Sequence, residues 1–156
     1  MIHIYVDADG CPVKNEIFKV AKRYELRVYV VSNSTMRIAD HELFELAVVY
    51  DQFDAADNWI VERAKDTDVV VTSDILLAAR CLEKKCRVLD PKGRTFTENS
   101  IGNSVANREL AGYLRDMGEI GGGPPPFQQR DRSMFLQRLD DLIQAAMKAE
   151  RKSNEA

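Results

Sequence analysis

Short apolar runs alternate with longer segments whose apolar residues recur at helical spacing, up to about residue 90. Repetition of an apolar run followed by a helical segment is typical of parallel strands joined by helices. We therefore expect a three-layer α/β sandwich, with a mostly parallel central sheet, right-handed crossovers and helices on both faces. The expected strands cover residues 2–6, 27–31, 46–50, 69–72 and 87–89, and the expected helices cover residues 14–24, 54–65 and 75–83.

Two segments fit this alternation less well. Residues 38–45 show no clear period, and a short helix is one interpretation. Residues 94–97 follow a tight turn at Pro91–Gly93 and are a possible short strand.

The pattern changes after residue 98. Residues 103–117 have helical spacing, and residues 118–127 form a loop that contains a Gly-Gly-Gly-Pro-Pro-Pro run. A last helix is expected from about Asp131, and its apolar side predicts that it packs on the body: Phe135, Leu139, Leu142, Ile143 and Ala146. We expect one domain over residues 1–150, with an acidic sheet edge within 1–90 and appended helices and the Gly/Pro loop within 98–150. The chain is expected to fray from Lys148, with residues 151–156 as a tail.

Composition is ordinary for a globular protein, with a net charge of −3. No apolar run is long enough to span a membrane, and the N-terminus begins with a strand pattern instead of a signal peptide. The three cysteines lack the paired spacing of a zinc site. A reduced, cytoplasmic protein without membrane contact is the simplest interpretation, and nothing in the pattern sets an oligomeric state.

Aspartates follow four of the expected strands directly. Asp7 and Asp9 follow the first, Asp51 the third, with Asp54 and Asp57 soon after, Asp74 the fourth and Asp90 the fifth. Because open parallel sheets bind ligands outside the carboxyl ends of their strands, these side chains are expected to gather at one edge. Crowded carboxylates repel one another unless a cation lies among them. The pattern therefore predicts a Mg²⁺ or Mn²⁺ site and phosphate chemistry.

Asp7, Asp57 and Asp74 are the expected catalytic residues, and with Asp9 and Asp54 they are the expected metal ligands. Metals held by such a set stabilise the attacking and leaving oxygens of an in-line attack on phosphorus by water. Helix capping explains Asp54 with Asp57, and Ser73 with Asp74, equally well on sequence alone. Asp51 and Asp90 are better explained as loop and turn residues.

Basic and polar residues near the same edge are candidate substrate contacts: Lys14, Asn33, Ser34, Arg130 and Arg132. Residues 38–62 contain seven acids and no lysine or arginine, whereas residues 14–27 contain five basic residues. An acidic centre beside basic segments fits a metal site next to a phosphate-binding surface, with RNA as the favoured partner. Solvated helix faces are an equally simple explanation of any one segment.

Several spaced blocks resemble those of the bacterial YaiI/YqxD family, a largely uncharacterised group regarded as PIN-like. These are Asp7–Lys14, Phe53–Asp57, Thr72–Ile75, Gly122–Pro125 and Gln129–Arg132, with Gly10 where alanine is expected. The resemblance implies a PIN-like fold and Mg²⁺- or Mn²⁺-dependent nuclease chemistry. Its acids would fall on Asp7, Asp57 and Asp74, with Asp9 as a fourth. PIN proteins typically carry glutamate where Asp57 stands.

Two other functions stay open. Asp7-x-Asp9 after a strand also resembles the motif of haloacid-dehalogenase phosphatases, in which Asp7 would be the nucleophile and Asp9 the acid/base. That class requires a downstream lysine, for which Lys84 or Lys85 could serve, and an acidic pair, of which Asp90 alone follows a strand. Alternatively, the chain is a non-catalytic RNA-binding module in which the basic candidates contact phosphate without metal.

Overall fold

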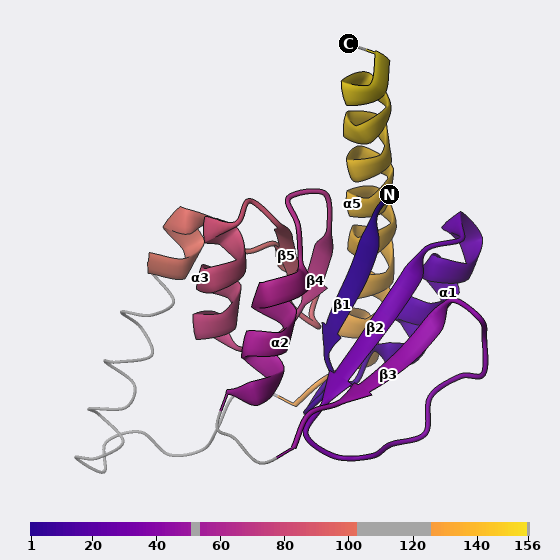
Figure 1. Cartoon of the computed structure of the whole chain (residues 1–156), viewed down its shortest axis with the longest axis vertical. Coiled ribbons are helices and arrows are strands. Elements are labelled where there is room, and N and C mark those ends of the chain that lie inside the picture. The colour runs from indigo at the N-terminus through magenta and orange to yellow at the C-terminus, as the bar shows by residue number, and fades with distance from the viewer. Residues whose placement is uncertain (51–53, 103–125, 156) are drawn as a thin grey trace.

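The computed structural model describes residues 1–50, 54–102 and 126–155. In this part of the chain five strands form one parallel sheet in the order β3-β2-β1-β4-β5 (Figure 1). The strands are β1 (His3–Asp7), β2 (Arg27–Ser32), β3 (Phe44–Val48), β4 (Val69–Val71) and β5 (Arg87–Leu89). The helices are α1 (Lys14–Tyr24), α2 (Ala55–Arg63), α3 (Ile75–Glu83) and α5 (Gln129–Glu155), and residues 98–102 are also helical.

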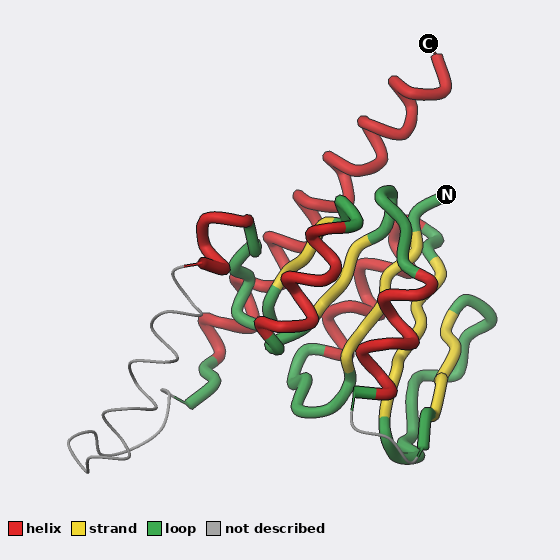
Figure 2. The backbone as a smooth tube through the Cα atoms, turned by 60° about the vertical axis from the view of Figure 1, so that its left-hand side comes forward, coloured by secondary structure: helices red, strands yellow, loops and turns green. Residues whose placement is uncertain are grey.

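The helices cover both faces of the sheet, which confirms the expected three-layer α/β sandwich (Figure 2). Alternate residues of β1 enter opposite cores: Ile4 and Val6 pack with α1 and α5, whereas Tyr5 packs with α2 and α3. The same alternation divides the valines of β4 between the two faces. No described helix combines the length and apolarity that crossing a bilayer requires.

The region before β3 differs from the expectation. Residues 38–41 lack regular structure, and the strand begins at Phe44, two residues before the predicted start. The Phe44 ring stacks on Phe18 with centroids 4.5 Å apart, and the N–H of Val28 donates to the carbonyl of Leu43 at 2.9 Å. Strand pairing and this aromatic contact therefore favour extended backbone over a short helix. The predicted strand at 94–97 is reduced to one antiparallel bridge between Leu89 and Thr95.

Helix α5 lies against α1 and then extends past the sheet (Figure 1). Its 27 residues correspond to about 40 Å at the usual helical rise. Phe135, Leu139 and Ile143 are fully buried on its inner side, as the apolar pattern predicts. The helix continues to Glu155 where fraying was expected, and the amino group of Met1 lies 2.9 Å from the carboxylate of Glu150. The helix predicted at 103–117 and the Gly/Pro run up to residue 125 lie outside the described residues.

The chain leaves the sheet in opposite directions after two neighbouring strands. After β1 it enters α1 on one face, and after β4 it enters α3 on the other. Open α/β sheets bind ligands where the connections diverge in this way, outside the carboxyl ends of the strands. The fold therefore places the topological switch point between the ends of β1 and β4, next to Asp7 and Asp74.

Candidate functional site

Thr72 connects the ends of β1 and β4. Its hydroxyl donates to Asp7 Oδ2 at 2.8 Å and accepts from the backbone N–H of Asp74 at 3.0 Å. Because Thr72 is only 1% exposed, both bonds are shielded from water and hold two of the predicted acids in a defined relation. On sequence alone Thr72 was the end of an expected strand and part of one family-like block. No sequence signal revealed its contact with Asp7, because that contact depends on the pairing of β1 with β4.

Asp74 caps α3. Its Oδ1 accepts from the N–H groups of Leu76 at 2.9 Å and Leu77 at 3.3 Å, so the capping interpretation is confirmed for this residue. Both of these bonds use the same oxygen, which leaves Oδ2 available for a cation or substrate. Capping and ligand binding are therefore compatible at Asp74.

Asp54 does not cap α2 with its side chain. It stands at the N-cap position with a left-handed φ of 68° and makes no side-chain cap hydrogen bond. A non-glycine residue in that region is uncommon and carries backbone strain. Asp57, in the first turn of α2, lies where the helix dipole favours a negative charge.

The carboxylates of Asp7, Asp57 and Asp74 lie within electrostatic reach of one another. Burial raises the pKa of Asp57 to about 6, and the charges of Asp74, Asp7 and Asp54 contribute in that order. Burial also raises the pKa of Asp7, with further contributions from Asp9 and Asp74, against the lowering effect of the Thr72 hydrogen bond. The structure therefore brings the three predicted catalytic acids together from β1, α2 and the start of α3.

Asp9 faces the end of β2. Its Oδ1 accepts from the Ser32 hydroxyl at 3.2 Å and its Oδ2 from the N–H of Asn33 at 3.4 Å. The Ser32 hydroxyl also accepts from the N–H of Ser34 at 3.1 Å. Asp9, Asn33 and Ser34 are thus gathered at one place beside Asp7, where Asn33 and Ser34 were predicted to meet substrate.

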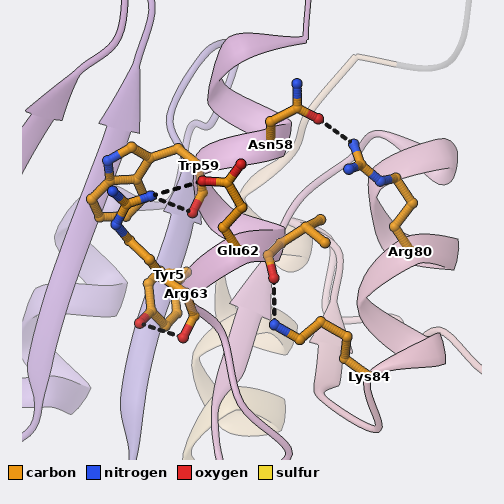
Figure 3. A network of polar contacts seen from close by, with 8 residues as sticks. Tyr5, Asn58, Trp59, Glu62, Arg63, Arg80 and Lys84 are labelled. Carbon is orange, nitrogen blue, oxygen red and sulfur yellow. Dashed lines mark hydrogen bonds and ion pairs between the residues drawn. The ribbon is translucent and has the colours of Figure 1, made fainter.

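Arg80 also influences the carboxylate cluster, although no sequence pattern indicated it. It projects from α3, and its Nη1 donates to Asn58 Oδ1 of α2 at 2.9 Å (Figure 3). Its positive charge lowers the pKa of Asp57, against the larger raising effects. The i+6 spacing from Asp74 gave no signal, since only the packing of α2 on α3 brings Arg80 near the acids.

Two predicted phosphate contacts have structural partners. The Lys14 amine donates to the carbonyls of Cys11 at 2.8 Å and Ala8 at 3.4 Å, which closes the loop between β1 and α1. Arg132 Nη1 donates to the Pro12 carbonyl at 2.6 Å and to Glu16 Oε1 at 3.1 Å, joining α5 to α1. Arg130 is exposed in the first turn of α5.

Asp90 and Asp51 were interpreted as turn and loop residues, and the structure tests this interpretation only for Asp90. Asp90 accepts from the N–H groups of Lys92 and Arg94, each at 2.9 Å, which confirms it as a turn residue. Asp51 lies outside the described residues.

The described acids offer few protein ligands to a cation. Among residues 1–50, 54–102 and 126–155, no group of three or more histidine, cysteine, aspartate or glutamate side chains stands at metal-ligand spacing. Mg²⁺ usually retains several waters and takes one or two carboxylates together with phosphate oxygens. Asp7, Asp57 and Asp74 are the residues that would hold such a cation, and its charge would oppose the burial and the neighbouring carboxylates that raise the pKa of Asp57.

Comparisons with known proteins identify relatives over nearly the whole chain. A family model described as "Uncharacterized BCR, YaiI/YqxD family" matches residues 5–145. A UPF0178 protein of Rhodospirillum centenum is 50% identical over 149 residues, covering 93% of this chain and 97% of that protein. One of Sphingopyxis alaskensis is 55% identical over 141 residues, covering 90% and 92%. No solved structure matches this chain. The chain belongs to the YaiI/YqxD family.

Proposed function

We propose that this protein is a PIN-like, Mg²⁺- or Mn²⁺-dependent phosphodiesterase that cleaves RNA. The observation that carries the proposal is the convergence of Asp7, Asp57 and Asp74 at the switch point of a parallel sheet, where the charges of Asp74 and Asp7 add to the effect of burial in raising the pKa of Asp57 to about 6. A site of this kind attracts a divalent cation and, through it, a phosphodiester.

Each acid has its own support. The Thr72 hydroxyl fixes Asp7, the first turn of α3 fixes Asp74 through Oδ1, and α2 presents Asp57. Mg²⁺ or Mn²⁺ would supply charge for the phosphate oxygens and a more acidic water for the attack. Asp9, braced by Ser32, adds negative charge on the β2 side of the cluster.

The phosphatase alternative receives less support. Its required lysine was assigned to Lys84 or Lys85, which follow the C-terminal end of α3, whereas Asp74 caps the N-terminal end. The nine residues of α3 correspond to about 13 Å of helix. The Lys84 amine donates to the carbonyl of Val61, as Figure 3 shows, and so points to α2.

Calorimetric titration with Mn²⁺, followed by cleavage assays on RNA and single-stranded DNA, tests the proposal. Wild type is expected to bind Mn²⁺ and cleave RNA, and Asp7→Asn and Asp74→Asn are expected to lose both activities. Asp66→Asn is the matched control, because Asp66 is exposed in the loop before β4, at the opposite end of that strand. RNA binding that is indifferent to chelator, without cleavage, would favour the non-catalytic module. A phosphorylated Asp7 would favour the phosphatase.

A further inference from the structure

A cavity of about 200 Å³ adjoins the carboxylate cluster on its β5 side. Ser73 and Ile75, the residues on either side of Asp74, contribute one wall, and Arg94 and Phe96 contribute another. The cavity therefore begins within one residue of a proposed metal ligand. None of the site residues expected from the sequence lines this cavity.

Arg94 is held in a fixed orientation by a buried acid. Asp90 is 5% exposed, and its Oδ2 accepts from Arg94 Nε at 2.8 Å. Its Oδ1 accepts from the N–H groups of Lys92 and Arg94. The Asp90 charge is thus used within the turn, while the Arg94 side chain is 77% exposed. With Nε engaged, the two Nη groups have no hydrogen-bond acceptor among the described residues and can donate in parallel to one phosphate.

The turn that carries Arg94 is rigid in the absence of ligand. The N–H of Asp90 donates to the Arg94 carbonyl at 2.9 Å, and the N–H of Gly93 donates to the Asp90 carbonyl at 3.0 Å. Gly93 has a φ of +88°, and a Cβ at this position would lie 3.1 Å from the backbone of Met134 in α5. The turn is therefore packed directly on α5. Its backbone is already ordered, so ligand binding would cost little conformational entropy there.

We propose that this cavity is a phosphate subsite in which Arg94 binds the nucleotide phosphate adjacent to the one at the carboxylate cluster. The hydroxyls of Ser73 and Thr95 add neutral donors, and Ile75 and Phe96 provide apolar surface for a ribose or base. The substrate class is then a single-stranded oligonucleotide with consecutive phosphates, because a mononucleotide would fill only one position. The subsite rests on the proposed function, which supplies the phosphate at the acids.

Fluorescence anisotropy of a short labelled RNA with non-cleavable linkages, in the presence of Mn²⁺ and over a range of potassium chloride concentrations, tests the subsite without cleavage. Arg94→Gln is expected to weaken binding by about tenfold, because a charged bidentate contact is lost. The slope of log K against log salt is expected to fall by about 0.7, the value for one phosphate contact on a single strand. Arg94→Lys should keep the salt slope but lose affinity, since a lysine cannot donate in parallel. Arg87→Gln, at the other end of β5, is the control and should match wild type.

Equal affinity and slope for wild type and Arg94→Gln would overturn the subsite, as would an absence of RNA binding by wild type. Far-ultraviolet circular dichroism identifies any variant that fails to fold. If Arg94→Gln fails to fold, Arg94→Lys is compared with wild type instead, since it retains a cation beside Asp90. The two proposals fail separately. RNA binding that depends on Arg94 without Mn²⁺-dependent cleavage would retain the subsite and reject the phosphodiesterase. Mn²⁺-dependent cleavage together with RNA binding that does not depend on Arg94 would retain the phosphodiesterase and reject the subsite.

Discussion

The hydroxyl of Thr72 lies 2.8 Å from Asp7 Oδ2, although the two residues are separated by 65 positions in the chain. The parallel pairing of β1 with β4 creates this contact, since Val6 is in register with Val71 and the next residues face each other at the strand ends. The bond favours the charged form of Asp7 in surroundings that otherwise raise the pKa of this carboxyl. Thr72 is therefore a positioning residue for the proposed metal site.

Thr72→Val is expected to weaken Mn²⁺ binding by about tenfold or more, as is common when the hydrogen-bond partner of a metal ligand is removed. The substitution keeps the shape of the side chain and removes the hydroxyl that lowers the pKa of Asp7. Calorimetry measures the affinity, and a carbonyl-carbon NMR titration measures the pKa, which should rise. Thr67→Val, in the loop before β4, serves as the control; an unchanged Mn²⁺ affinity in Thr72→Val would show that the hydroxyl has no such role.

Asp57→Asn is expected to stabilise the metal-free protein at neutral pH. A carboxyl whose folded-state pKa is about 6, above its ordinary 3.8, disfavours folding once it is ionised. The penalty develops as the pH rises from about 4 to about 6 and is absent below that window. We expect a gain of about 1 kcal/mol at pH 7.5, reduced by solvent screening of this partly exposed group, and no gain near pH 3.5. Urea unfolding at the two pH values measures it, and a gain of equal size at both would contradict the electrostatic origin.

Gly93→Ala is expected to destabilise the protein by about 1–3 kcal/mol, because the new Cβ would meet the backbone of α5 and the φ of +88° is strained for alanine. Two other glycines separate these causes. Gly10 has a φ of +73° but open space around it, and Gly102 has open space without a positive φ. Thermal unfolding should rank Gly93→Ala as the most harmful, Gly10→Ala as intermediate and Gly102→Ala as harmless. Equal losses at Gly93 and Gly10 would show that contact with α5 contributes nothing.

Arg132→Met is expected to cost about 1–3 kcal/mol of stability, because it leaves the carboxylate of Glu16 without its partner. Glu16 Oε2 is already a buried oxygen without a hydrogen-bond partner in the described structure, so the loss is not easily offset. A double-mutant cycle with Glu16→Gln in denaturant unfolding isolates the pair. If Arg132→Met instead leaves stability intact and weakens RNA binding, Arg132 is a substrate contact, as its sequence context first indicated.

The strand-end rule was sufficient to predict that Asp7 and Asp74 lie at the same edge of the sheet, because parallel pairing brings all such ends together. It could not predict Thr72 or Arg80, since their roles depend on the β1–β4 register and on the packing of α2 against α3. Lys14 and Arg132 were expected at the substrate for their charge alone, and the structure adds hydrogen bonds from both to backbone carbonyls that no sequence pattern reveals. The predicted bounds were most accurate for helices with an apolar stripe that packs against one of the two cores, as in α1 and α3. The start of β3 was missed because the pairing of Phe44 with Phe18 is a tertiary contact.

The strand order β3-β2-β1-β4-β5 also determines at which stage of synthesis and folding the acidic cluster can form. Synthesis delivers β1, β2 and β3 first, and these can pair as neighbours while β4 is still inside the ribosome. Asp7 then stands at an open sheet edge, without Thr72 beside it and without the charges of Asp57 and Asp74. Insertion of β4 next to β1 closes that edge and assembles the three carboxylates in one step. A chain truncated before β4 would therefore lack Thr72 and Asp74, and occupancy of the proposed metal site would report that β4 has paired with β1.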